Sequence, residues 1–233
     1  MRALRNPVRA ERMHPYFGVT PGGYGENDVF LGLGVPAIRR LARTFRGATT
    51  PLRHGLLASP IHEERFLALL LMLDAYRVGD AAQRKAVCRE YLDQRTQVNN
   101  WDLVDLSAPH ILGSYLLNEG GLESHPKILD TLCSARSLWD RRIALLSTFP
   151  FIRAGRFDWT LRLCAKLLGD REDLIHKAAG WMLREVGKRD VRAVESFLGR
   201  HCREMPRTML RYAAEKLPPA RRRAYLDGIP PGH

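Results

Sequence analysis

Helical periodicity runs through nearly the whole sequence and constrains the fold more than any other feature. Apolar residues recur every three to four positions, and no stretch of useful length alternates apolar and polar residues as a half-buried β-strand does. We therefore expect an all-α chain of about a dozen helices, joined by short loops and stacked as hairpins. Residues typical of helix starts precede the periodic segments at Pro36, Ser59, Asp80, Asn100 and Pro126.

The hydrophobic residues are numerous enough for a sizeable core but form no membrane span. Of the 233 residues, 45% are hydrophobic and 27% are charged. The longest apolar run, residues 66–73, is bounded by charged residues on both sides and predicts a buried helix. The arginine-rich N-terminus lacks the apolar stretch of a secretory signal. We expect a cytoplasmic protein that does not bind a membrane.

The cysteine and histidine residues do not indicate a metal centre or a disulfide framework. Cys88, Cys133, Cys164 and Cys202 are dispersed within apolar helical patterns, without C-x-x-C spacing. The eight histidines include no H-E-x-x-H sequence. We therefore expect reduced cysteines in the core, no metal site and no organic cofactor.

Net charge is the one extreme value of the composition. With 37 Lys and Arg against 25 Asp and Glu, the formal net charge is +12 and the isoelectric point is about 10.1. After residue 150, 18 basic residues stand against 10 acidic ones. Such a charge attracts polyanions, so nucleic acid is the leading partner class, although a merely solvated cationic surface would have the same composition.

Tryptophan residues recur at a spacing typical of helical repeats. Trp139 lies 38 residues after Trp101, and Trp181 lies 42 residues after Trp139. Both intervals are near the roughly 40–47-residue period of two-helix HEAT or armadillo units. Each hairpin of such an array buries its apolar face only against its neighbours, and the array curves. We therefore expect a single domain over residues 1–233, a curved α-solenoid of HEAT-like helical repeats.

A glycine-rich segment at about residues 18–34 interrupts the helical pattern near the N-terminus. Glycine this dense argues against a helix. No Gly-Lys-Ser/Thr sequence follows the segment and no strand precedes it, so it is not a phosphate loop of the P-loop type. We expect turns here, although exposed backbone N–H groups in such a loop could also meet a phosphate.

A short helix that begins after Asn100 would place an indole and a carboxylate on one face. Trp101 and Asp105 lie four residues apart, one turn above the other. Burying both would be costly, because an ionised carboxylate needs a partner and an indole N–H needs an acceptor. Two interpretations stay open: a surface that a ligand completes, or a packed tryptophan beside a structural salt bridge. The apolar face of this helix would consist of Leu103, Val104 and Leu106.

Equivalent positions on successive inner helices of a repeat array form a row. Asp105 and Arg142 are 37 residues apart and are candidates for neighbouring positions in that row, with Trp101 and Trp181 on either side. The row could line a ligand site. Alternatively, Asp105 and Arg142 could form a buried ion pair that ties two repeats together.

Four segments form a recognisable series along most of the chain: residues 30–36 (FLGLGVP), 101–105 (WDLVD), 139–144 (WDRRIA) and 176–185 (HKAAGWMLRE). In these segments the sequence resembles the HEAT-like repeat DNA alkylation repair proteins, the AlkD-like alkylpurine DNA glycosylases. The last three segments, in this order and at this spacing, are the specific ones. The resemblance implies hydrolysis of the N-glycosidic bond of purines alkylated at ring nitrogen 3 or 7 in duplex DNA.

The resemblance also implies a set of site residues. The catalytic aspartate of the family matches Asp105, the flanking tryptophan Trp101, the supporting arginine Arg142 and the second tryptophan Trp181. An alkylated base departs as a neutral group while positive charge develops on the deoxyribose, so an anion and aromatic faces suit that transition state. No lysine accompanies these residues, so we expect a monofunctional glycosylase without a Schiff-base step.

A second hypothesis keeps the fold without the chemistry. The chain would then be a non-catalytic HEAT-like module or scaffold that binds DNA, or a protein, through a basic concave face.

For the glycosylase we expect duplex DNA that contains alkylated bases as the partner, and we expect the protein to be a monomer. Basic residues in and after the last two segments are the candidate DNA-binding residues: Arg141, Lys177, Arg184, Lys188 and Arg189.

Overall fold

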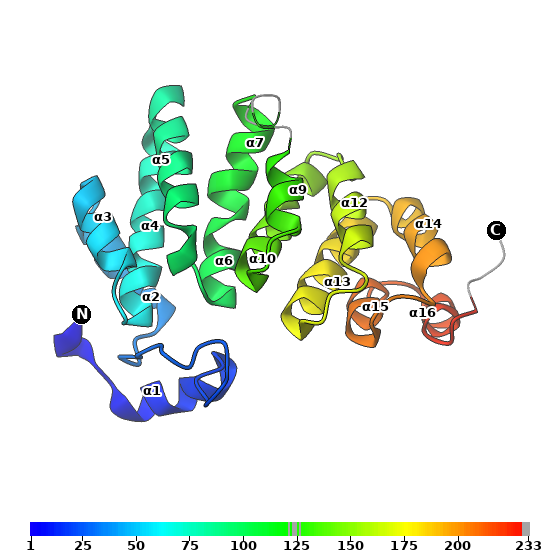
Figure 1. Ribbon diagram of the computed structural model, residues 1–233, viewed down its shortest axis with the longest axis horizontal. Helices are drawn as coiled ribbons and strands as arrows, with labels where there is room; N and C mark the ends of the chain where they lie inside the picture. The colour runs from blue at the N-terminus through cyan, green and yellow to red at the C-terminus, as the bar shows by residue number, and fades with distance from the viewer. Residues whose placement is uncertain (121, 123–124, 126, 230–233) are drawn as a thin grey trace. The chain divides into compact units, whose positions relative to one another are not determined.

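Helices make up the regular secondary structure of the computed structural model, which describes residues 1–120, 122, 125 and 127–229 (Figure 1). Apart from an isolated bridge between Val29 and Ile61, no β-structure occurs in these residues. The all-α prediction is therefore confirmed. Contacts divide the chain into two units, Met1–Tyr115 and Leu116–His233. The single-domain organisation and the curvature of the solenoid stay predictions.

Helix α4 (His62–Val78) forms the core of the first unit. Residues 66–72 are all buried, which confirms the buried helix predicted from the apolar run. A helix that is apolar on all sides needs neighbours on all sides. Figure 1 shows α4 among the four helices that it contacts most: α2 (Val35–Thr44), α3 (Thr50–Leu57), α5 (Ala81–Asp93) and α6 (Trp101–Ser107).

The expected helix starts correspond to local features of this unit. Pro36 lies in the first turn of α2, where its missing N–H costs no hydrogen bond. Asp80 caps α5 in a capping box with Gln83. Ser59 precedes α4, and its hydroxyl accepts the Ile61 N–H at 3.1 Å.

Short elements complete the first unit. Between η2 (His14–Tyr16) and α2 the chain forms turns rather than a helix, as its glycine content predicts. Helix α7 (Ser114–Asn118) contains the boundary between the two units. The remaining elements are η1 (Arg2–Leu4), α1 (Pro7–Met13), η2 (His14–Tyr16), η3 (Arg95–Gln97) and η4 (Pro109–Gly113).

Helix α13 (Asp173–Gly187) is the central helix of the second unit. It approaches α15 (Arg207–Ala213) closely at Gly180, where a β-carbon would lie 2.5 Å from the Met209 carbonyl oxygen. Pro126, an expected helix start, lies outside the described residues. The other helices of this unit are α9 (Ile128–Cys133), α10 (Leu138–Leu146), α11 (Phe149–Arg153), α12 (Asp158–Lys166), α14 (Val191–His201) and α16 (Pro219–Leu226).

The cysteines lie in the cores of the two units. All four are free and buried, which confirms the prediction of reduced core thiols: Cys88, Cys133, Cys164 and Cys202. Burial raises the pKa of the Cys88 thiol to about 12, because a thiolate there would lose its hydration.

Candidate functional site

Helix α6 carries the first half of the predicted site. Asn100 adopts an extended conformation at the N-cap, and its side-chain oxygen accepts the Trp101 N–H at 2.9 Å. Trp101 and Asp105 follow one turn apart, and both are partly exposed. The buried face of the helix differs slightly from the expectation: Leu103, Val104 and Ser107 are buried, whereas Leu106 is partly exposed.

The N-terminal segment covers part of the Trp101 indole. The Phe17 ring stacks on it, with centroids 5.3 Å apart and an interplanar angle of 10°. The indole N–H donates to the Tyr16 carbonyl oxygen at 3.0 Å. The Tyr16 side chain is itself largely exposed. Sequence reasoning missed these two residues, which are 84 and 85 positions from Trp101 and have no motif that links them to it.

A buried polar network joins α6 to α4 and to the glycine-rich loop. The two ring nitrogens of His62 each face a carboxylate: Nε2 lies 2.9 Å from Asp102 Oδ2, and Nδ1 lies 3.2 Å from Asp28 Oδ2. Arg65 donates to the other oxygen of Asp28 at 2.6 Å. Asn100 donates to Asp28 and to the Phe17 carbonyl oxygen, each at 3.2 Å. In the interior, the two acidic side chains Asp28 and Asp102 thus face the two basic side chains His62 and Arg65.

The network shifts the pKa of His62 and the pKa of Asp28. Burial alone would lower the pKa of His62, but the hydrogen bonds to Asp102 and Asp28 raise it above its ordinary value. Burial alone would raise the pKa of Asp28, but the hydrogen bond to His62 and the charge of Arg65 lower it. Both ring nitrogens face carboxylate oxygens, and only the protonated imidazolium of His62 can donate to both, which is why these contacts raise its pKa.

A second acid, Glu63, anchors the end of the loop. Its carboxylate is buried and accepts the backbone N–H groups of Leu31, Gly32 and Leu33 at 2.8 to 3.1 Å. These N–H groups therefore bind a carboxylate of the chain itself rather than a phosphate, and the expectation of turns is the one confirmed. Gly32 has φ = +79°, a left-handed conformation that side chains rarely adopt.

Arg142 and Trp181 lie in the second unit, on the adjacent helices α10 and α13. Arg142 is 5% exposed, and its guanidinium donates to the Leu174 carbonyl oxygen at 2.6 Å, which joins the two helices. The Trp181 indole is partly exposed, and its N–H donates to Glu185 at 3.2 Å. The structure thus places Trp101 and Asp105 one turn apart on α6 in one unit, and Arg142 and Trp181 on the adjacent helices α10 and α13 in the other.

The five candidate DNA-binding residues have different environments within the second unit. Arg141 is mostly buried and forms an ion pair with Asp170 at 2.6 Å. Arg184 pairs with Glu215. Lys177 is partly exposed beside Asp173, at 2.8 Å. The other two, Lys188 and Arg189, are exposed at the end of α13.

Neither a cluster of metal ligands nor a membrane-spanning helix occurs among the described residues. Within this part of the chain, no three His, Cys, Asp or Glu side chains are grouped as a metal site would need. None of the described helices combines the length and the apolar character that crossing a bilayer requires.

Comparisons with known proteins agree with the sequence resemblance. Residues 1–217 match the family model described as DNA alkylation repair enzyme. No curated protein matches the chain. Among solved structures, a protein described as a predicted DNA alkylation repair enzyme from Enterococcus faecalis is similar, with a TM-score of 0.69 and 20% sequence identity. The alignment covers 92% of this chain and 97% of the other, so the two share an all-α helical repeat fold.

Proposed function

The chain belongs to the DNA alkylation repair enzyme family, and on that premise we propose that it is a monofunctional alkylpurine DNA glycosylase. The proposed substrate is duplex DNA with a purine alkylated at nitrogen 3 or 7. The observation that carries the proposal is the pairing of Asp105 with Trp101, a partly exposed carboxylate and indole one turn apart on α6. In the proposed enzyme this face binds the deoxyribose of the lesion.

Asp105 is assigned the role of the catalytic anion. The C1′–N bond breaks with its electron pair on the base, which leaves as a neutral alkylpurine and leaves positive charge on the sugar. Asp105 stabilises this oxocarbenium ion and accepts a hydrogen bond from the water whose oxygen joins C1′. The products are the free base, an abasic deoxyribose and a proton.

The size of this effect follows from Coulomb's law. Two unit charges about 4 Å apart in an effective dielectric of about 20 attract each other by roughly 4 kcal/mol. That free energy corresponds to about three decades in rate. Asp102, the neighbouring acid, binds His62 through its Oδ2 and belongs to the buried network.

The remaining residues have supporting roles in the proposal. Trp101, held by Phe17 and the Tyr16 carbonyl, offers an aromatic face to the cationic sugar. Trp181, in the second unit, is assigned an aromatic contact to the DNA, as the family resemblance implies. Arg142 is assigned a supporting role within the second unit, where its buried guanidinium joins α10 to α13 through the Leu174 carbonyl oxygen. The exposed residues of the basic group attract the DNA backbone, whereas Arg141 and Arg184 act from within ion pairs.

The test compares the wild type with Asp105→Asn. Methylated duplex DNA is incubated with each protein, free methylpurines are quantified, and DNA affinity is measured in parallel. We expect base release by the wild type and a loss of about three decades in Asp105→Asn, with unchanged affinity. Asp93→Asn, at an exposed position on α5, is the matched control and keeps full activity.

The other outcomes decide against the proposal. Equal base release by Asp105→Asn and the wild type refutes the role of Asp105. DNA binding without base release by the wild type supports the non-catalytic HEAT-like module instead. The stacking of Phe17 on Trp101 favours this second candidate, because it covers one face of an indole that the enzyme would use.

A further inference from the structure

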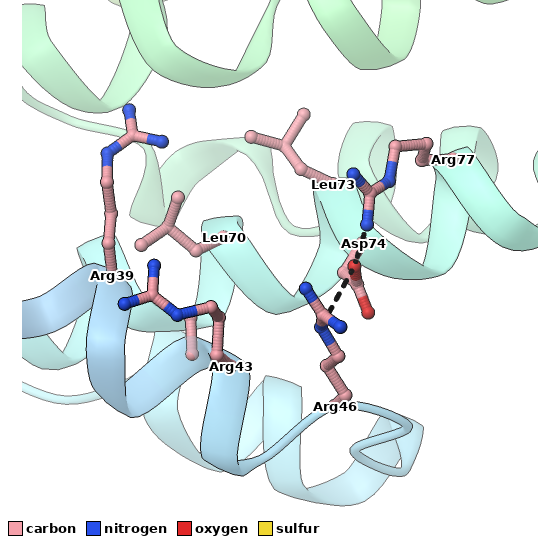
Figure 2. Close-up of a pocket in the computed structure, with 8 residues that line it drawn as sticks. Arg39, Arg43, Arg46, Leu70, Leu73, Asp74 and Arg77 are labelled. Carbon is pink, nitrogen blue, oxygen red and sulfur yellow. Dashed lines mark hydrogen bonds and ion pairs between the residues drawn. The ribbon is translucent and has the colours of Figure 1, made fainter.

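Four arginines surround a cavity between α2 and α4 in the first unit. It lies toward the C-terminal end of α4, whereas His62 and its network lie at the N-terminal end of that helix. The cavity has a volume of about 310 Å³. In Figure 2, Arg39, Arg43 and Arg46 extend from α2 and the following turn, and Asp74 and Arg77 come from the last turns of α4. The full lining consists of Arg39, Ala42, Arg43, Arg46, Leu70, Leu73, Asp74 and Arg77.

The spacing of the α2 arginines explains why they converge. Arg39 and Arg43 are four residues apart on α2, so their side chains lie on one side of the helix, and Arg46 follows in the turn after it. Ile38 is 2% exposed and holds α2 against the core. The arginine side is left exposed, and Leu70 and Leu73 of α4 provide an apolar floor for the aliphatic parts of the arginines.

Positive charge in this cavity exceeds negative charge. Asp74 is the one acid in the lining, and its carboxylate lies 2.7 Å from Arg77 and 3.9 Å from Arg46. Neither Arg39 nor Arg43 has a hydrogen-bonded or ion-paired side-chain partner anywhere in the described parts of the chain. Three positive charges therefore remain uncompensated, and a bound anion would relieve their mutual repulsion.

We propose that this cavity, the arginine pocket, binds a phosphodiester of the DNA backbone through Arg39 and Arg43. Guanidinium groups match phosphate oxygens with paired N–H donors, which an ammonium group does not do. The site stays wide open, since Arg46 and Arg77 have side chains 59% and 68% exposed. An open site suits a phosphate that belongs to a long polyanion, whose other phosphates meet the protein elsewhere and hold it in place.

The arginine pocket would position DNA without reading its sequence or its damage. Contacts to phosphate fix orientation and add affinity for every duplex alike. The inference rests on the proposed function only for its partner, DNA, and needs no base release. It therefore predicts binding to unmodified duplexes that does not depend on Asp105.

The test is the salt dependence of binding to an unmodified duplex. In the full chain, Arg39→Ala with Arg43→Ala is compared with a control that removes two exposed arginines outside the cavity, Arg40→Ala with Arg89→Ala. We expect the arginine-pocket variant to bind about ten- to hundredfold more weakly than the control. The slope of log K against log salt should fall by about 0.9 for each phosphate that the variant no longer neutralises.

Asp74→Asn provides a second variant with the opposite expected sign. Removing this carboxylate adds one net positive charge and releases Arg46 and Arg77, so DNA affinity should rise and the salt slope should steepen. This outcome cannot come from a folding defect, because misfolding does not strengthen binding.

Three results would overturn the inference. The arginine-pocket variant could match its control in affinity and slope, or Asp74→Asn could leave both unchanged. Inorganic phosphate could also prove to be the ligand, if phosphate binding is abolished in the arginine-pocket variant while DNA binding stays intact. A wild type without base release but with the expected slopes would refute the glycosylase and leave this inference standing.

Discussion

Replacing Asp28 by Asn tests whether the buried network holds the glycine-rich loop. Asp28 is 7% exposed and accepts hydrogen bonds from His62, Arg65 and Asn100 at 2.6 to 3.2 Å. Asparagine keeps the shape but removes the charge and presents an NH₂ group among donors. Breaking a buried ion pair from one side costs about 3–5 kcal/mol, because the partner charge stays buried.

That free energy translates into a measurable loss of stability. For a chain of this size the midpoint of thermal unfolding falls by roughly 2–4 °C per kcal/mol, so Asp28→Asn should lower Tm by about 6–20 °C. Urea unfolding followed by circular dichroism measures the free energy of unfolding, and tryptophan fluorescence of the native protein reports on all four tryptophans together, Trp101 among them. The emission should shift, since Phe17 and Tyr16 contact the indole from the loop that Asp28 anchors.

The dependence of folding stability on pH has a defined sign for both His62 and Asp28. The pKa of His62 is raised, so its contribution to stability is complete below about pH 6.5 and is lost as the pH rises through the raised value. The pKa of Asp28 is lowered, so its contribution is present above about pH 3.8 and is lost as the pH falls through the lowered value. The groups that face His62 are Asp28, Asp102 and Arg65.

The variant and its control separate this account from a general charge effect. In Asp28→Asn the pKa of His62, measured by NMR, should fall, because one of two carboxylates is gone. Asp93→Asn removes an exposed carboxylate whose ion pair with Arg89 is solvated, and should change stability by less than about 0.5 kcal/mol. An Asp28→Asn protein as stable as Asp93→Asn would refute the reasoning.

Two further predictions concern backbone and core. Gly32→Ala should destabilise the protein by more than about 2 kcal/mol in urea unfolding, because φ is +79° and the new β-carbon would lie 2.1 Å from the Asn6 carbonyl oxygen. Gly55→Ala, at a position on α3 where a β-carbon meets open space, should instead stabilise the protein by up to about 1 kcal/mol. Equal changes in the free energy of unfolding for Gly32→Ala and Gly55→Ala would contradict the packing described. A thiol reagent at pH 8 should leave the native cysteines unmodified and react with all four after unfolding. The reason is that burial raises the pKa of Cys88 to about 12 and that of Cys133 to about 11. Rapid reaction of the native protein would show instead that a thiol is accessible.

Sequence patterns were sufficient to predict features that depend only on residues close to one another in the chain. The apolar run at residues 66–72 predicts a buried helix because no polar face is left, and α4 is buried on all sides. Asn100 predicts a helix start because its side chain can accept an orphan backbone N–H, and it does so at Trp101. The four-residue spacing of Trp101 and Asp105 follows directly from the helix that the cap begins.

Contacts between distant segments were not predictable from the same signals. His62 matches only part of a metal-binding motif in the sequence, yet it binds Asp28 and Asp102, which are 34 and 40 positions away. Glu63 stands where an acid favours the start of a helix, yet its carboxylate binds the loop at Leu31 to Leu33. Sequence periodicity marks neither pairing, because the partners lie in a distant loop or, for Asp102, on another helix, and packing sets where these segments meet.

The sequence alone therefore determined the helical class, the buried core helix, the reduced cysteines and the Trp101–Asp105 face, since each depends on residues within a few turns of one another. The tertiary structure alone decided that Phe17 covers Trp101, that Asp28 and His62 anchor the loop, and that four arginines and one aspartate line a single cavity beside α2. The reason is physical: hydrogen bonds and charges between distant segments form only after the hydrophobic core has brought those segments together.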